Sequence, residues 1–153
     1  MQKNIKYIVV IAILSMAGTL QAQVYNSAVG ARLGTFFTGS YKTFISESNA
    51  LEAVVGFDGY GGRTSLLAGA FFQLHNDLNL DGAEFQWYYG FGGYVLLGDA
   101  TGIAPSGIVG LEYTLKDAPV NFFIDAIPTL FLVSGASDFQ INGSLGARYI
   151  LNY

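Results

Sequence analysis

The 153-residue sequence contains no cysteine and only one histidine. The lack of cysteine excludes a disulfide framework, and it also excludes a lipid anchor attached through a cysteine. One histidine without cysteine leaves few ligands for a transition-metal site. We therefore predict neither a bound metal nor a cofactor.

Charge is also scarce, because charged residues make up 12% of the chain, against about 25% in soluble domains. Acidic residues outnumber basic ones and the net charge is −4. This balance excludes nucleic acid as a partner, because its phosphates require a basic surface. Beyond residue 22 there is no apolar run approaching the roughly 20 residues of a spanning helix. Low charge without such a helix is typical of strands whose outer face meets lipid.

The N-terminus has the order of segments of a secretory signal peptide. It carries Lys3 and Lys6, then an apolar run from Tyr7 to Ala17, then small residues. The alternative is an uncleaved anchor helix, for which the apolar run is short. We predict a signal peptide over residues 1–22 and a single domain over residues 23–153.

The last fifteen residues, 139–153, alternate in character. Every second residue is apolar or aromatic, and those between are mostly hydrogen-bonding residues. A period of two indicates a strand with one apolar and one polar face, whereas a helix would carry Gly143 and Gly146 unfavourably in its interior. An apolar-out, polar-in strand that ends on an aromatic residue is what an outer-membrane barrel requires.

Alternation and turn residues divide the mature chain into eight strands. The fold class predicted is all-β, an eight-stranded antiparallel transmembrane β-barrel. The first two strands would also fit one long bent strand, but an even count keeps both termini on the periplasmic side. The predicted strands are residues 27–34, 40–45, 50–58, 64–75, 84–97, 105–115, 120–132 and 139–153.

Three cations and four anions fall on the predicted inner face. Because buried charges must pair, we predict a closed lumen filled by ion pairs and hydrogen bonds. A polar relay for ions, a ligand pocket and a catalytic carboxylate pair remain alternatives. The predicted network is Arg32, Lys42, Glu52, Glu84, Glu112, Asp125 and Arg148.

Outward aromatic residues gather near the predicted periplasmic end of the strands. Amphipathic rings of this kind form a girdle at headgroup depth, although aromatic residues are common in strands generally. The predicted girdle is Tyr41, Phe72, Phe85, Trp87, Tyr113 and Phe122, joined by Tyr149 and Tyr153 from the last strand.

Enzymatic chemistry finds little support in the sequence. A hydrolase or acyltransferase would require a histidine base beside a serine nucleophile. His75 is predicted at a strand end, solvated, beside a polar turn over residues 76–83. We therefore predict no enzymatic activity. Pro105 and Pro128 remove ladder hydrogen bonds and are the only hints of a wall defect that would serve transport of hydrophobic ligands.

Four stretches resemble the small outer-membrane β-barrel proteins of Bacteroidetes-type bacteria, a group that is mostly without assigned activity. The resemblance covers nearly the whole mature chain. It implies that Tyr149, Leu151 and Tyr153 carry the signal read by the barrel-insertion machinery. The Asp-Trp-Lys-Pro-like stretch of that group is Asp-Ala-Ile-Pro here, at residues 125–128. The resembling stretches are residues 41–44, 87–90, 110–119 and 148–153.

These observations together predict a small, monomeric barrel of the bacterial outer membrane with a closed polar lumen and a structural or interaction role. Its expected partners are outer-membrane lipid and, during assembly, the insertion machinery. Two alternatives remain, namely transport of small hydrophobic ligands across the outer membrane and a secreted, lipocalin-like ligand-binding barrel.

Overall fold

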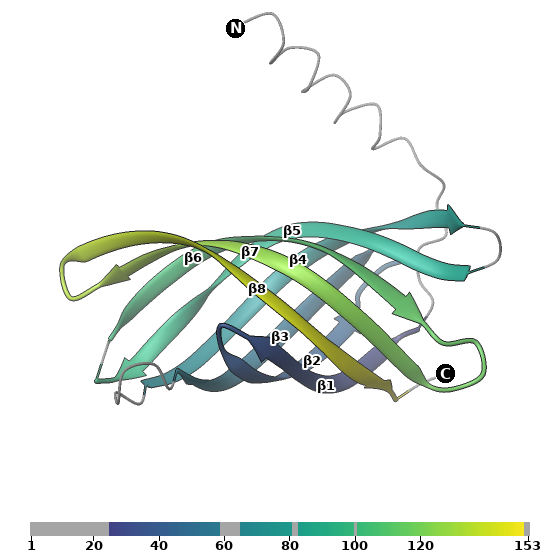
Figure 1. Cartoon of the computed structure of the whole chain (residues 1–153), viewed down its shortest axis with the longest axis horizontal. Helices are drawn as coiled ribbons and strands as arrows, with labels where there is room; N and C mark the ends of the chain where they lie inside the picture. Colours follow the sequence, from purple (N-terminus) through teal and green to yellow (C-terminus); the bar gives the residue numbers. More distant parts are fainter. Residues whose placement is uncertain (1–24, 59–64, 81–82, 100, 152–153) are drawn as a thin grey trace, which may run out of the picture.

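The chain forms a closed antiparallel barrel in which each strand pairs with its neighbours in sequence and the first strand pairs with the last (Figure 1). The computed structural model describes residues 25–58, 65–80, 83–99 and 101–151. The predicted signal peptide and Tyr153 lie outside the described residues. The strands are β1 (Ser27–Gly34), β2 (Phe37–Phe44), β3 (Asn49–Asp58), β4 (Ser65–Leu80), β5 (Ala83–Gly98), β6 (Gly102–Thr114), β7 (Val120–Val133) and β8 (Ala136–Ile150).

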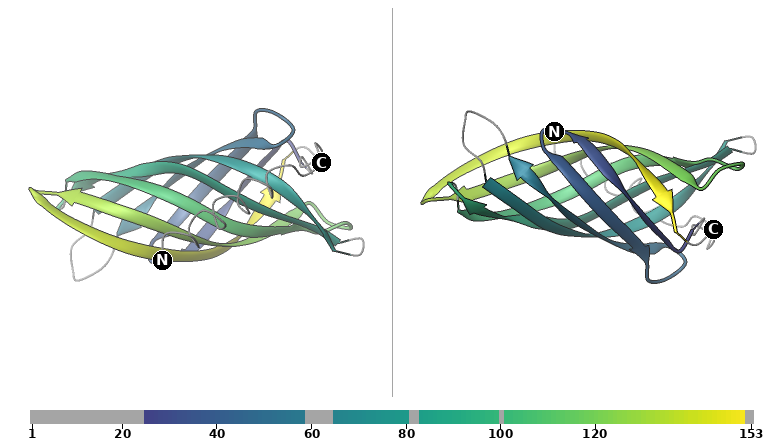
Figure 2. Two further views of the ribbon diagram at one scale, coloured as in Figure 1. Left: turned by 90° about the horizontal axis from the view of Figure 1, so that it is seen from above. Right: turned by 90° about the horizontal axis from the view of Figure 1, so that it is seen from below.

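This architecture confirms the predicted all-β, eight-stranded antiparallel barrel. It also separates the first two strands, which pair from Ser27 opposite Thr43 to Arg32 opposite Thr38. Within the described part of the chain, no helix has the length and apolar character needed to cross a membrane. Figure 2 shows the strands strongly tilted around the barrel, as closure of a sheet requires.

Several strand ends lie beyond their predicted positions. The loop expected over residues 35–39 is shorter, because Phe37 already pairs with Phe57 on β3. The polar turn expected over residues 76–83 is mostly strand, since Asn76 to Leu80 continue the ladder with β5. The polar residues of β4 have a low strand propensity, but the aromatic-rich start of β5 supplies a continuous partner for them.

The loop expected over residues 133–138 is a tight hairpin. Val133 pairs directly with Ala136, and the two residues between them, Ser134 and Gly135, have φ values of 51° and 81°. Positive φ at both central residues is the conformation of a type I′ hairpin turn. Likewise β6 begins at Gly102, inside the loop expected over residues 98–104.

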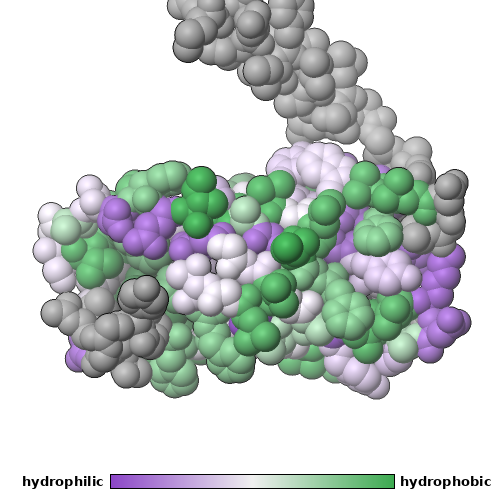
Figure 3. Space-filling view, in the orientation of Figure 1, coloured by the Kyte–Doolittle hydropathy of each residue, from purple (hydrophilic) through white to green (hydrophobic). Residues whose placement is uncertain are grey.

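Burial follows the predicted alternation along most of the barrel, although residues 136–141 at the distal start of β8 are all exposed. In β6, for example, Ser106, Glu112 and Thr114 are buried whereas Val109 and Leu111 are exposed. The outward residues are large and apolar around the whole barrel, and Figure 3 shows hydrophobic side chains spread over the visible flank. Examples from every strand are Val29, Tyr41, Val55, Leu66, Phe91, Leu111, Ile124 and Leu145, each at least one-third exposed.

Inward glycines make room for large luminal side chains. A Cβ atom at Gly110 would lie 2.6 Å from the Tyr88 ring, and one at Gly146 would lie 2.5 Å from the Phe123 ring. These distances are too short for real contacts, so a larger residue would displace the aromatic ring. Small and large side chains therefore alternate across the narrow lumen, as expected for eight strands.

The two ends of the barrel differ in the strand termini that they carry. The proximal end is the one where β1 begins and β8 finishes, and the distal end is the one that carries the β7–β8 turn (Figure 1). At the distal end the wall is uneven, because β1 pairs with β8 only as far as Gly34 opposite Ser144, while β8 continues to Ala136 against β7.

Candidate functional site

The lumen holds a compact group of buried charges contributed by six strands. Three cations face three anions, so the network is balanced in formal charge. All six residues are at most 6% exposed. They are Arg32 on β1, Lys42 on β2, Glu52 on β3, Glu112 on β6, Asp125 on β7 and Arg148 on β8. Glu84, the seventh member predicted, is half-buried near the start of β5, and the ion pairs seen among the described residues do not include it.

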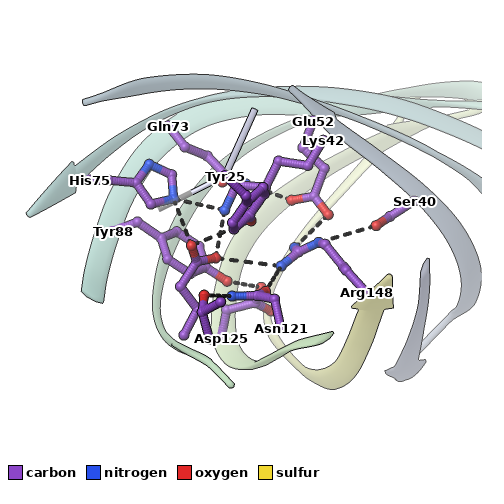
Figure 4. Close-up of polar contacts among 12 residues, drawn as sticks. Tyr25, Ser40, Lys42, Glu52, Gln73, His75, Tyr88, Asn121, Asp125 and Arg148 are labelled. Carbon is purple, nitrogen blue, oxygen red and sulfur yellow. Dashed lines mark hydrogen bonds and ion pairs between the residues drawn. The ribbon is translucent and has the colours of Figure 1, made fainter. Parts of the chain in front are cut away.

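Glu52 accepts hydrogen bonds from three other strands, and Figure 4 shows it beside Arg148. One of its oxygens, Oε1, accepts from Arg32 Nη1 at 2.8 Å and from Arg148 Nη2 at 2.7 Å. The other oxygen, Oε2, accepts from Gln73 Nε2 at 2.6 Å. Three donors on three strands thus converge on one carboxylate, which joins β1, β4 and β8 to β3 across the lumen.

Asp125 neutralises the far side of Arg32. Its Oδ2 atom accepts from Arg32 Nη2 and from the Tyr88 hydroxyl, the latter at 2.7 Å. Ser144 donates to Oδ1 of the same carboxylate and accepts from Arg32 Nη2. This carboxylate is therefore held by donors from β1, β5 and β8.

Arg148 connects the two carboxylate groups of the proximal half. Besides Glu52, it lies 3.5 Å from Glu112 and donates to Asn121 Oδ1 at 3.1 Å. Its guanidinium also lies 3.7 Å from the centre of the Phe123 ring, a favourable cation–π position. Every face of this buried cation thus has a partner.

Lys42 occupies an aromatic cage at the proximal end. Its ammonium donates to Glu112 Oε2 at 2.6 Å and lies 2.7 Å from His75 Nε2. The centre of the Tyr88 ring is 4.8 Å from the same nitrogen. A primary amine so enclosed is compensated by one carboxylate, one imidazole and π-faces.

Tyr25, which precedes β1, covers the network at the proximal end of the barrel. It is 3% exposed, its ring meets Phe44 edge-on at 5.2 Å, and its hydroxyl donates to Glu112 Oε1 at 3.4 Å. Burial, with a smaller contribution from the charge of Glu112, raises the pKa of the Tyr25 phenol well above its ordinary value. The phenol therefore remains a proton donor to the carboxylate.

The prediction that His75 is a solvated turn residue is wrong. His75 is 2% exposed in the middle of β4, because that strand continues to Leu80. Its ring stacks on Tyr88 at 5.1 Å and lies 4.8 Å from Phe44. The Nδ1 atom of His75 has no hydrogen-bond partner.

The predicted polar network occupies only the proximal half of the lumen. The distal half is filled by an apolar cluster, against which Phe36 and Phe131 pack from the mouth. A cavity of about 10 Å³ lies at the border of the two halves, between Arg32, Thr38 and Ile127, and has room for about one water molecule. The cluster comprises Val54, Leu67, Phe71, Tyr88, Tyr94, Leu96, Ala104, Ile108 and Ile127.

The predicted girdle residues all lie at outward positions. Phe85 contacts Tyr113 at 4.6 Å, and Tyr113 pairs in turn with Phe122 on β7, so these three form one row across β5, β6 and β7. Trp87 stacks on Tyr89 at 5.3 Å, and Phe72 lies 5.7 Å from Phe91. Tyr41 and Tyr149 are about half exposed and pair with Val29 from its two sides.

The predicted insertion signal is described in part. Tyr149 points outward from β8, and Leu151 is exposed just after it. The amide of Leu151 donates to the carbonyl of Ser27 at 2.9 Å, which joins the end of β8 to the start of β1.

Sequence reasoning did not assign Tyr25 or His75 to the lumen network. Alternation places Gln73, Tyr88 and Asn121 on the inner face, but it does not reveal which inward residues share a height. No protein-family model matches the sequence, and no curated protein matches it either.

Proposed function

We propose that this chain is a small outer-membrane β-barrel protein with a closed lumen and a structural or interaction role in the bacterial envelope. One observation supports this above all others. The charged side chains of six strands point inward and pair with one another, while large apolar side chains point outward around the barrel. That polarity suits a lipid surround and a filled interior.

The competing proposal is a secreted barrel that binds a ligand in the manner of a lipocalin. A water-soluble barrel places its apolar residues inside and exposes few large ones. Here Phe37 is 64% exposed, Phe91 is 66% exposed and Ile141 is 70% exposed. Surfaces of soluble monomers rarely carry such extensive apolar patches, so the membrane proposal is favoured, despite the apolar half of the lumen.

The expected partners follow from this placement. Outer-membrane lipid would cover the apolar flank, and the insertion machinery would receive the terminal strand. The resemblance of four sequence stretches to small outer-membrane barrels of Bacteroidetes-type bacteria supports the same assignment. The lumen is complete with side chains from one chain, which supports a monomer.

The proposal includes no enzymatic activity. His75 is the single histidine of the chain, and the polar contacts of its ring among the described residues are Lys42 and Glu112 rather than a serine hydroxyl. An activated serine nucleophile requires a base within hydrogen-bond reach. The arrangement around His75 instead resembles a filled, aromatic-lined core.

Cell fractionation tests the membrane proposal. We expect the mature chain in the outer-membrane fraction, starting at Gln23, and we expect heat-modifiable migration in gels because a folded barrel resists detergent until boiled. Recovery of a folded, soluble protein from the periplasm would contradict the proposal and favour the lipocalin-like alternative.

Planar-bilayer recording tests the closed lumen. The balanced ion-pair network and the apolar cluster fill the interior, since an eight-stranded barrel is narrow enough for side chains to fill. The purified protein should therefore show no stable open channel. A steady, large conductance would refute the filled lumen, and a porin of known conductance inserted in the same bilayer would control for the measurement.

A further inference from the structure

The β6–β7 seam differs from the other seven seams of the barrel. Pro105 lies on β6 and Pro128 lies on β7, and both face outward on this same seam. Proline has no backbone N–H, so each removes one donor from a ladder. Two defects that are distant in sequence are thus brought to one place in the wall.

The pairing pattern shows where the ladder is interrupted. Among the described residues, the strands pair at Ser106 opposite Thr129 and again from Val109 opposite Ala126, but residues 104–105 and 107–108 have no partner on β7. The ladders of the other seams run without a gap between their first and last pairs. The wall is therefore weakest between residues 104–108 and 127–131.

Two side-chain hydroxyls hold the seam at its centre. Ser106 Oγ donates to Thr129 Oγ1 at 3.0 Å across the two strands. The same hydroxyls also contact backbone carbonyls two residues earlier on their own strands, at 3.0 and 3.1 Å. One hydrogen bond between two neutral hydroxyls holds the strands together less strongly than the two backbone hydrogen bonds that the prolines remove.

An apolar groove of about 460 Å³ borders the seam on the outer surface. Trp87, Leu111 and Ile124 line its sides. Ala126 lies at the end of the groove that is nearest the interrupted part of the β6–β7 ladder. Beyond Ala126, Gly107 faces Pro128 across the seam. A Cβ atom at Gly107 would lie 3.3 Å from Pro128 Cγ.

The inner surface of the same seam is apolar on either side of the Ser106–Thr129 hydroxyl pair. Ala104 and Ile108 from β6 and Ile127 from β7 belong to the distal apolar cluster. Phe131, only partly buried, packs against them. Apolar surface therefore lies on both sides of the weakest part of the wall.

We infer that the β6–β7 seam is a lateral portal through which a single-chain amphiphile passes from the outer groove, so that its hydrocarbon chain lies in the distal half of the lumen. This inference rests on the membrane placement proposed above. The chain replaces Phe36 and Phe131 as packing partners of the apolar cluster. These two rings are the members that are only partly buried.

The border between the luminal halves supplies the polar end of the site. Asn142 is 4% exposed, and its Nδ2 donor has no hydrogen-bond partner. It lines the small cavity together with Thr38 and Ile127. A buried donor without an acceptor is unfavourable, so a carboxylate or other accepting headgroup would satisfy it while the chain lies among apolar side chains.

A disulfide lock across the seam tests the portal. Ser106→Cys with Thr129→Cys places two thiols where the hydroxyls now meet, in a chain without native cysteine. Trp87→Phe with Phe131→Trp leaves one indole, in the distal lumen. The protein is placed in nanodiscs of unbrominated lipid, and dibromostearic acid is added as the quencher. We expect saturable quenching of this indole with thiols reduced, loss of quenching after oxidation, and recovery on reduction.

Two controls keep the experiment decisive. Ala53→Cys with Ala70→Cys, paired on the uninterrupted β3–β4 seam, should leave quenching unchanged. Pro105→Val with Pro128→Val restores the two donors without cysteine and should also suppress quenching. Absence of quenching in the reduced protein would overturn the luminal site, and quenching that oxidation does not alter would overturn the portal. Heat-modifiable migration of the same samples reports separately on the membrane barrel.

Discussion

Replacing Glu52 by glutamine is expected to lower the free energy of unfolding of the barrel by about 3–5 kcal/mol. Glu52 is 1% exposed and accepts from Arg32, Arg148 and Gln73 at 2.6–2.8 Å. The neutral amide keeps the volume of the side chain but removes the negative charge that the guanidinium groups of Arg32 and Arg148 share. Two buried cations would then lack one of their compensating carboxylates. Urea unfolding of the protein in vesicles, followed by the fluorescence of Trp87, measures the change.

Two further variants separate charge balance from general damage. Glu84→Gln alters a half-buried carboxylate near the β4–β5 turn, outside the network, and should change stability by less than about 0.5 kcal/mol. Glu52→Gln combined with Arg148→Met removes one charge of each sign. We expect the double variant to lose less than the sum of its single changes, by about 0.5–3 kcal/mol. Equal losses for Glu52→Gln and Glu84→Gln would contradict the central role of Glu52.

The two faces of the barrel could be predicted from sequence because side chains alternate with a period of two. Arg32, Glu112 and Arg148 are inward, and Val29, Leu111 and Tyr149 are outward, as the pattern indicates. A register shift of one residue would invert a whole strand, so agreement along most of each strand is a strong constraint. The eight-fold count followed from the turns between these alternating segments.

Strand ends were less accessible. Asn76 to Leu80 have the composition of a turn, yet they form strand because residues 83–87 pair with them. The outcome depends on a partner that is contributed by another part of the chain. Ser134 and Gly135 form the hairpin turn within a longer polar segment, and composition alone does not specify which two residues take positive φ.

The contents of the lumen were predicted only in outline. Alternation places charged residues inside, but it does not give the tilt and stagger that bring Lys42, His75 and Glu112 to one height. His75 was misassigned because the end of its strand was misplaced. The apolar half of the lumen was not predicted, although Phe71, Tyr94 and Ile127 occupy inward positions. Alternation marks a residue as inward but does not show which inward residues cluster at the same end of the barrel.

The combined effect of the two prolines could not be predicted from sequence. The sequence predicts that each proline removes a ladder hydrogen bond, but their combined effect depends on both lying on one seam. That coincidence follows from the register, in which Gly107 stands opposite Pro128. Only the pairing of β6 with β7 turns two tolerated residues into one weakened stretch of wall.

Deletion of residues 151–153 is expected to abolish membrane insertion and leave a protease-sensitive chain in the periplasm. The amide of Leu151 makes a contact that closes the barrel, to the carbonyl of Ser27 at 2.9 Å. An unclosed edge in lipid leaves backbone groups unpaired at a cost of several kcal/mol each. By resemblance, Tyr149, Leu151 and Tyr153 would also be the signal offered to the insertion machinery. Surface protease digestion and outer-membrane fractionation measure the loss.

A larger deletion at the other end of the same strand provides the matched control. Removing Leu132, Val133, Ala136 and Ser137 shortens the β7–β8 hairpin by two residue pairs, two residues from each strand, so the alternation and the turn at Ser134 and Gly135 are preserved. This segment of β8 has no β1 partner among the described residues, and closure of the barrel does not depend on it. The four-residue deletion should therefore insert almost normally, whereas the three-residue deletion should not. Equal outer-membrane levels for the terminal deletion and the full-length protein would refute the closing role of the chain end, because backbone pairing elsewhere in the barrel would then be sufficient.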